Sequence, residues 1–253
     1  MHLDIQKANM WKRISAALFD VILLSVVVAF LAMLLSSVLR FDTYNSGLES
    51  CYSKYEAQFG ISFDITIDEY NAMTQQEIDL YNEAYAAFSE DTDAIYYFNM
   101  IVRLTITIAS ISILLGYLAL EFAVPLFLKE GRTLGKKIFG IGLMRTHGVR
   151  ITPVALFIRT FLGKFAIETM IPVLIILMIF WGTIGVVGPL VIAGILLLQL
   201  ILIVSSRTNS VIHDRLSDTV VVDMESQMIF DTEEELIEYT KRLHAEKASK
   251  QVY

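Results

Sequence analysis

The fold is decided by residues 13–39, RISAALFDVILLSVVVAFLAMLLSSVL. After Arg13, the apolar run from Ile14 to Leu39 has 26 residues, and about 20 suffice to cross the hydrocarbon core of a bilayer. Asp20 is the only ionisable residue in this run. A carboxylate at that depth costs about 3 kcal/mol on insertion scales, so it usually faces protein or a water-filled cavity. The run therefore predicts a first transmembrane helix with a polar function or a polar contact inside it.

Arg13 and Asp20 are seven residues apart, which places them on one helical face and about 10 Å apart along the axis. Asp20 is thus expected in the leaflet that Arg13 borders. Two readings of each residue stay open. Arg13 is either a snorkelling helix-end anchor or part of a site, and Asp20 either pairs structurally with a neighbouring helix or handles a ligand or a proton.

The composition indicates an integral membrane protein, because 55% of the 253 residues are hydrophobic and they are concentrated in blocks. The net charge of −7 hides a strong segregation: residues 41–94 hold twelve acidic residues and one basic residue, Lys54. Such segregation follows topology and argues against nucleic-acid binding. Cys51 is the single cysteine, which excludes an intramolecular disulfide and a cysteine-based metal site. We expect no metal and no cofactor.

The basic residues predict the orientation of the chain in a cell membrane. Lys7, Lys12 and Arg13 precede the first span, and residues 129–164 carry eight basic residues against the single acid Glu130. Positive flanks stay in the cytoplasm, so both termini are predicted to be cytoplasmic. The predicted segments are 1–40 as the N-terminus and first transmembrane helix, 41–94 as an acidic extracytoplasmic insertion, 95–128 as the second transmembrane helix, 129–164 as a basic cytoplasmic segment, 165–204 as the third and fourth transmembrane helices, and 205–253 as the cytoplasmic tail.

Local patterns predict further elements outside the spans. Thr74 and Glu77 form a capping-box pattern before a helix of about 75–89, so the insertion is read as a small helical cap, with a weakly ordered insertion as the alternative. The runs around a Thr-His-Gly turn in residues 138–151 predict a short cytoplasmic β-hairpin. Pro153 is expected to start a helix lying along the inner membrane surface, and a polar helix is expected over 232–248. The fold class is therefore an all-α membrane protein with four transmembrane helices, a short β-hairpin and a helical insertion.

The ionisable residues in or near the predicted spans fall at one depth, in or just beneath the inner leaflet. Because unpaired charges would be costly there, several of them are expected to pair and form one shared site. These candidate site residues are Arg13, Asp20, Glu121, Arg159, Glu168, Asp214 and Arg215. Three more basic residues are predicted to contact anionic lipid headgroups, at about 1 kcal/mol each: Arg132, Lys136 and Lys137.

Five features in this order resemble the RDD family of membrane proteins, which is named for one arginine and two aspartates. They are Arg13 before the first span, Asp20 within it, the stretch GRTLGKKIFGI at 131–141, the helix with Arg159, and HDRLSDT at 213–219. The resemblance assigns the arginine to Arg13 and the aspartates to Asp20 and Asp214. It implies a membrane protein for which transport has been proposed, with some members linked to cation/proton antiport and others acting as accessory subunits.

Two functions remain open from the sequence. The first is a transporter exchanging a cation for protons at the inner-leaflet carboxylates, which with four spans would need a homo-oligomer. The second is a scaffold or accessory subunit that docks a membrane partner protein. An enzyme is not expected, because the sequence has no metal motif, nucleophile elbow or phosphate-binding loop.

Overall fold

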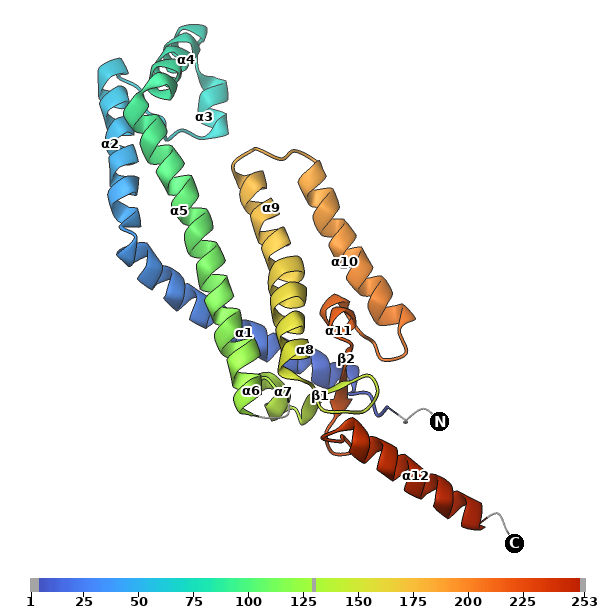
Figure 1. Ribbon diagram of the computed structural model, residues 1–253. Coiled ribbons are helices and arrows are strands. Elements are labelled where there is room, and N and C mark those ends of the chain that lie inside the picture. Colours follow the sequence, from blue (N-terminus) through green and yellow to red (C-terminus); the bar gives the residue numbers. More distant parts are fainter. Residues whose placement is uncertain (1–4, 129–130, 251–253) are drawn as a thin grey trace. The chain divides into compact units, whose positions relative to one another are not determined.

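A computed structural model describes residues 5–128 and 131–250 (Figure 1). Four of its helical segments are long and apolar enough to cross a membrane: Met10–Val38, Thr92–Phe127, Pro153–Phe180 and Val187–Ser205. The chain divides into two compact units, one made of residues 1–29 with 113–253 and the other of residues 30–112. The candidate site lies wholly within the first unit.

The first two spans are helices α1 (Met10–Val38) and α5 (Thr92–Tyr117). The second span continues from α5 through a π-helical stretch, η1 (Leu118–Ala123), into the short α6 (Val124–Phe127). In α1, Ala16 and Asp20 are buried, and they lie four residues apart on one face. The only charged residue of the apolar run therefore points into protein, on the same face as Ala16.

The third span differs from the sequence-based expectation of a surface helix followed by a separate span. The chain instead forms one continuous helical segment: α8 (Pro153–Phe157), a π-helical stretch η2 (Ile158–Met170) and α9 (Ile171–Phe180). No proline stands between Pro153 and Pro172, so no missing backbone donor ends the helix there. The predicted division into a surface helix and a separate span is wrong, and Arg159 and Lys164 lie inside the candidate span Pro153–Phe180.

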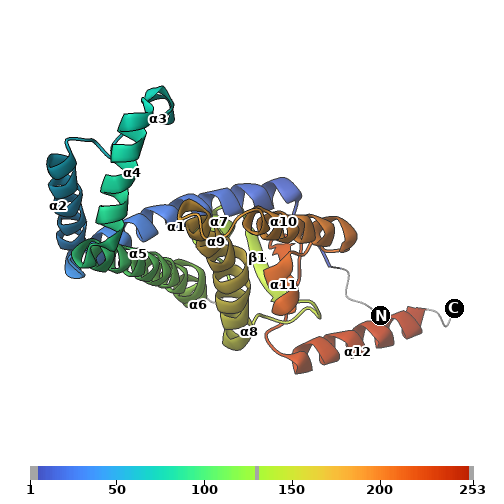
Figure 2. The same cartoon turned by 90° about the horizontal axis from the view of Figure 1, so that it is seen from above.

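The fourth span, α10 (Val187–Ser205), follows a short connection that contains Gly182 at a φ of +67°. A positive φ is open to glycine at little cost, so the chain can reverse at once. Helices α9 and α10 lie side by side in both views (Figure 2). A Cβ added at Gly188 of α10 would lie 3.1 Å from side-chain atoms of Ile175 and Ile179 of α9. The absence of a side chain at Gly188 therefore permits the close approach of the two helices.

The two-stranded antiparallel sheet is confirmed, but its pairing differs from the expected hairpin. Strand β1 (Ile141–Arg145) pairs with β2 (Thr219–Asp223) from the tail, in the register Ile141↔Asp223 to Arg145↔Thr219. The predicted Thr-His-Gly turn forms, with Gly148 at a φ of +93°, yet it contributes only the bridge Met144↔Arg150. Both faces of this small sheet are buried: Met144, Val220 and Val222 on one face, and Ile141, Leu143 and Val221 on the other, are at most 4% exposed. The tail is thereby bound to the segment between the second and third spans.

Three short or terminal elements complete the first unit. Helix α7 (Leu134–Ile138) precedes β1, and α11 (Ile212–Leu216) precedes β2. The terminal helix α12 (Glu233–Lys250) begins after Thr232, whose hydroxyl accepts a hydrogen bond from the Glu235 backbone at 3.3 Å, so the predicted terminal helix is confirmed.

The second unit contains helices α2 (Phe41–Phe59), α3 (Ile67–Ala72) and α4 (Gln75–Glu90). The capping box of Thr74 and Glu77 is formed, and the predicted helix of about 75–89 is confirmed. Aromatic side chains from α2 and α4 make its core: the rings of Tyr52 and Phe88 stack at 4.5 Å between centroids. The acidic insertion is thus an ordered helical unit.

Candidate functional site

A cavity of about 370 Å³ lies within the first unit. Residues from α1, α7, α10, α11, β2 and the second and third spans line it. Its charged lining comprises three carboxylates and four cationic side chains: Asp20, Glu121, Glu168, Arg13, Lys136, Arg159 and Lys164. A cavity of this size is in the range that holds small molecules, and here it is unusually rich in charge.

Asp20 is held by the N-terminal turn of α7. One carboxylate oxygen accepts from the Thr133 hydroxyl at 2.5 Å, and the other accepts from the backbone N–H of Gly135 at 2.8 Å. The ammonium of Lys136 stands 3.8 Å from the first oxygen. Backbone donors at the start of a helix favour a negative charge, so Asp20 joins α1 to α7 at the edge of the cavity.

Gly135 is required where α7 meets α1. A Cβ at this position would lie 2.4 Å from the Ala16 carbonyl oxygen and 2.8 Å from an Asp20 oxygen. Because the nearest atom belongs to the backbone, Gly135→Ala is expected to destabilise the protein by about 1–3 kcal/mol. Thermal unfolding in detergent checks this, with Gly194→Ala as the control, since nothing lies within 4 Å of a Cβ there. Equal midpoints for the two variants would contradict the expected close contact.

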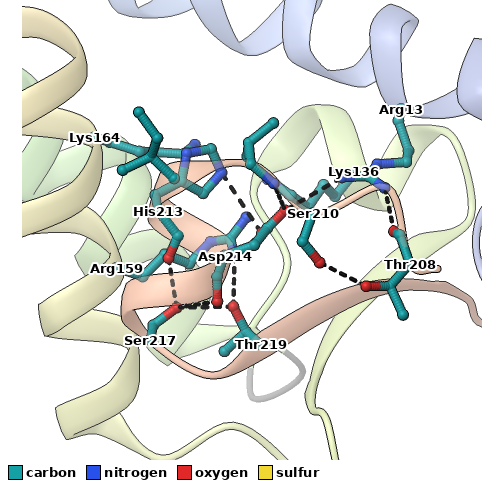
Figure 3. A network of polar contacts seen from close by, with 12 residues as sticks. Arg13, Lys136, Arg159, Lys164, Thr208, Ser210, His213, Asp214, Ser217 and Thr219 are labelled. Atoms are coloured by element: carbon teal, nitrogen blue, oxygen red, sulfur yellow. Dashed lines mark hydrogen bonds and ion pairs between the residues drawn. The ribbon is translucent and has the colours of Figure 1, made fainter. Parts of the chain in front are cut away.

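Asp214 is the centre of a buried network that we call the clasp: Arg13, Arg159, Asp214 and Thr219 (Figure 3). Arg159 donates to Asp214 and, at 2.7 Å, to the Thr219 hydroxyl. Arg13 lies 3.3 Å from the other Asp214 oxygen and also donates to the Thr208 carbonyl at 3.0 Å. Burial alone would raise the pKa of Asp214, but the guanidinium groups of Arg159 and Arg13 hold it below its ordinary value. The clasp therefore joins α1, the third span and the tail through ionised groups.

Two lysines face carboxylates across the cavity. Lys164 forms a 2.5 Å ion pair with Glu121, and the Thr160 hydroxyl donates to the Glu121 backbone carbonyl at 3.0 Å. Lys136 is only 7% exposed. Its burial, together with the nearby charge of Lys164, lowers the pKa of Lys136 to about 8, against the opposing attraction of Glu121 and Asp20. Lys136 is therefore a cation that can lose its proton near physiological pH.

Glu168 differs from the other carboxylates because its hydrogen-bond partners are neutral. It accepts from the backbone N–H of His213 at 3.1 Å and contacts the His213 ring Nδ1 at 2.7 Å. Burial and the charge of Arg159 lower the pKa of His213, despite the opposing effects of Asp214 and Glu168. The lowered pKa favours the neutral imidazole, which can donate a hydrogen bond from Nδ1 to Glu168 without bringing a charge. Gln199 of α10 also hydrogen-bonds Glu168.

The π-helical winding of η2 aligns the third span with the site. Arg159, Lys164 and Thr169 follow one another at intervals of five residues, and they reach Asp214, Glu121 and the Tyr117 hydroxyl respectively. In an α-helix five residues make about 1.4 turns, so these side chains would diverge. The i→i+5 bonding of a π-helix keeps such residues on one side, and π-helical turns are frequent at functional sites.

Most of the predicted site residues are brought together here. Arg13, Asp20, Glu121, Arg159 and Glu168 line the cavity, and Asp214 lies directly against it in the clasp. Arg215 does not join them, because its side chain is exposed, whereas its neighbour Asp214 is buried.

The three residues predicted to contact lipid headgroups separate in the structure. Lys136 is buried in the cavity, so that prediction is wrong for it: the turn of α7 directs it toward Asp20. Lys137 is exposed and Arg132 is half-buried, and their contact with headgroups stays a prediction. Sequence reasoning missed Lys164 and His213 as site residues. For Lys164, the five-residue spacing from Arg159 was a signal in the sequence, but it indicates a shared site only if the helix is assumed to be π-helical.

Comparison with known families matches residues 7–218 to the RDD family. Comparison with curated proteins and with solved structures found no match. The matched range includes all four spans, the three residues of the motif and every charged group that lines the cavity. The chain therefore belongs to the RDD family of membrane proteins.

Proposed function

We propose that this RDD protein is a transporter that exchanges a monovalent cation for a proton in the charged cavity. The observation that carries the proposal is the charge balance around Lys136. Within the described part of the chain, the cavity and clasp contain four cationic side chains and four carboxylates. A buried group of charges is tolerated when it is neutral as a whole.

The exchange follows from the loss of one proton. With Lys136 protonated, the charges of the cavity and the clasp balance. When Lys136 gives up its proton, the carboxylates exceed the cations by one, and a monovalent cation entering from solution restores neutrality. When the proton returns to Lys136, the bound cation faces a surplus of positive charge and leaves. Proton and cation therefore alternate at the same cavity without a net charge remaining buried.

Flux across liposomes tests this directly. Purified protein is reconstituted with a pH gradient, and individual monovalent cations, both alkali and organic, are added outside. At least one cation should dissipate the gradient with wild type and with Lys137→Met, whose lysine is exposed, but not with Lys136→Met. A gradient that no cation dissipates would refute the exchange.

The alternative function is a non-transporting scaffold, and the clasp favours it. Arg13, Arg159 and Asp214 satisfy one another and hold the N-terminal segment, the third span and the tail together. A protein that docks a membrane partner also needs its segments to be held in a fixed arrangement of this kind. The scaffold function predicts that a single stoichiometric membrane protein copurifies with the chain and that liposomes show no flux.

The proposed transport carries two further expectations. Four spans are few for alternating access, so we expect the active form to be a homo-oligomer, which the mass of the detergent-solubilised particle would reveal. We also place both termini in the cytoplasm, because basic residues flank the first span and fill the segment before the third. Reaction of single cysteines at the two termini with a membrane-impermeant reagent, in cells and in inverted vesicles, measures this orientation.

A further inference from the structure

One wall of the cavity is apolar and is formed by residues of α1 and α10. The apolar residues of α1 that line it include Ile14, Ala17, Val21 and Leu24, at intervals of three and four, and Ile203 of α10 adds a further apolar side chain. Ile14 is 49% exposed and Val21 is 56% exposed, although both lie in a membrane span. Residues that line a cavity and also face the bilayer mark an opening toward lipid. A ligand entering there would first contact the apolar side chains of α1 and then the charged side chains of the cavity.

The cavity is poorly suited to a bare metal cation. Its 370 Å³ would leave room for about ten waters around such an ion. Among the residues that the structure describes, no group of three or more His, Cys, Asp or Glu side chains is placed to hold a metal ion. Small hard cations are usually held by six or more oxygen ligands. A larger organic cation fits both the volume and the mixed lining.

The charge of such a ligand would find its partner at Glu168. Each of the other carboxylates in the site has an ammonium or guanidinium group within 4 Å, whereas Glu168 is held by neutral donors. Tyr117 also lines the cavity, and an aromatic ring attracts a cation at its face. The titratable and charged groups that share the cavity with Glu168 are His213 of α11, Glu121 and Tyr117 of the second span, Arg159 and Lys164 of its own helix, Arg13 and Asp20 of α1, and Lys136 of α7, with Asp214 beside them in the clasp.

We infer that the cation exchanged in this cavity is an amphipathic organic cation that enters from the bilayer, with its charge at Glu168 and its apolar part against α1 and α10. This inference rests on the proposed function and names its substrate class. A quaternary ammonium group bearing an alkyl chain has the required chemistry. Its charge needs no coordinating oxygens, and its chain replaces lipid along the exposed wall of α1.

Two probes with the same head separate the contributions of head and tail. Binding of tetramethylammonium and of hexyltrimethylammonium to the full-length protein in detergent is measured at pH 8.5. Hexyltrimethylammonium should bind at least tenfold more tightly, because its chain buries apolar surface. Glu168→Gln should weaken binding of both probes by at least tenfold. Leu24→Ala should weaken hexyltrimethylammonium several-fold and leave tetramethylammonium unchanged. Leu18→Ala is the control, because Leu18 is 60% exposed on α1 and does not line the cavity.

The outcomes distinguish this inference from the proposed function. Equal affinity for the two probes, or an unchanged affinity in Leu24→Ala, would overturn the inference. Proton exchange driven by sodium or potassium alone would also overturn it while leaving the exchange function intact. Absence of exchange with every cation would instead remove the proposed function itself. Should Glu168→Gln fail to fold, Leu24→Ala still decides, since it changes a lipid-facing wall and no polar contact.

Discussion

Replacing Asp214 by asparagine is expected to lower the free energy of unfolding by about 3–5 kcal/mol. Asparagine keeps the size of the side chain but removes the charge that two arginines share. Arg159, which is only 2% exposed, and the half-buried Arg13 would then lose the carboxylate that they share. The cost of leaving such charges uncompensated exceeds the net worth of the ion pairs themselves.

Reversible unfolding in mixed detergent micelles measures this change. Glu238→Gln is the matched control, because Glu238 forms an exposed ion pair with Arg242 on α12, and such pairs are worth about 0–1 kcal/mol. A small effect of Asp214→Asn, similar to that of the control, would mean that the clasp does not hold the tail to the spans.

The clasp should also resist acid. The pKa of Asp214 is below its ordinary value of 3.8 in the folded protein, so the unfolded chain takes up a proton first as pH falls. The contribution of the Asp214 carboxylate to the free energy of unfolding is therefore fully present above about pH 4 and is lost only at lower pH.

Lys136→Met is expected to abolish the pH dependence of cation binding. In wild type the proton on Lys136 competes with the cation, so affinity should rise about tenfold per pH unit up to about pH 8 and then level off. Methionine has no proton to lose, so the variant should bind cations with the same affinity from pH 6 to pH 9. It should nevertheless fail in exchange, because it carries no proton back.

Titration of hexyltrimethylammonium at several pH values measures the profile, and Lys137→Met should reproduce wild type. Burial and Arg159 lower the pKa of His213, so protonation of His213 moves away from the alkaline part of the profile, where Lys136 titrates. If the wild-type affinity does not depend on pH, or if Lys136→Met keeps the wild-type dependence of affinity on pH, the proton on Lys136 does not compete with the cation.

The sequence was sufficient for the features that depend on local patterns. The apolar run after Arg13 predicted α1, and the capping box of Thr74 and Glu77 predicted α4 to within one residue at its end. The common depth of the charged residues predicted a shared site, since helical rise converts residue number into depth. The buried face of α1 that carries Asp20 follows from the cost of exposing a carboxylate to lipid.

Other features depend on distant partners or on an unusual winding. The pairing of Ile141 with Asp223 joins segments 82 residues apart, whereas the nearby Thr-His-Gly turn made a local hairpin the simpler prediction. Neighbouring lysines at 136 and 137 are equivalent in the sequence, and only the turn of α7 against Asp20 buries the first of them. The π-helical winding of η2 has no established compositional signal, so the alignment of Arg159 with Lys164 was not predicted.

The most direct test of the exchange is the number of protons released when a cation binds. Saturating hexyltrimethylammonium is added to the purified protein in weakly buffered detergent solution at pH 7, and the proton release is measured with a pH indicator. Wild type should release about one proton per chain, because Lys136 is largely protonated at this pH, and Lys136→Met should release none. Binding without proton release in wild type, or equal release from both proteins, would contradict the account.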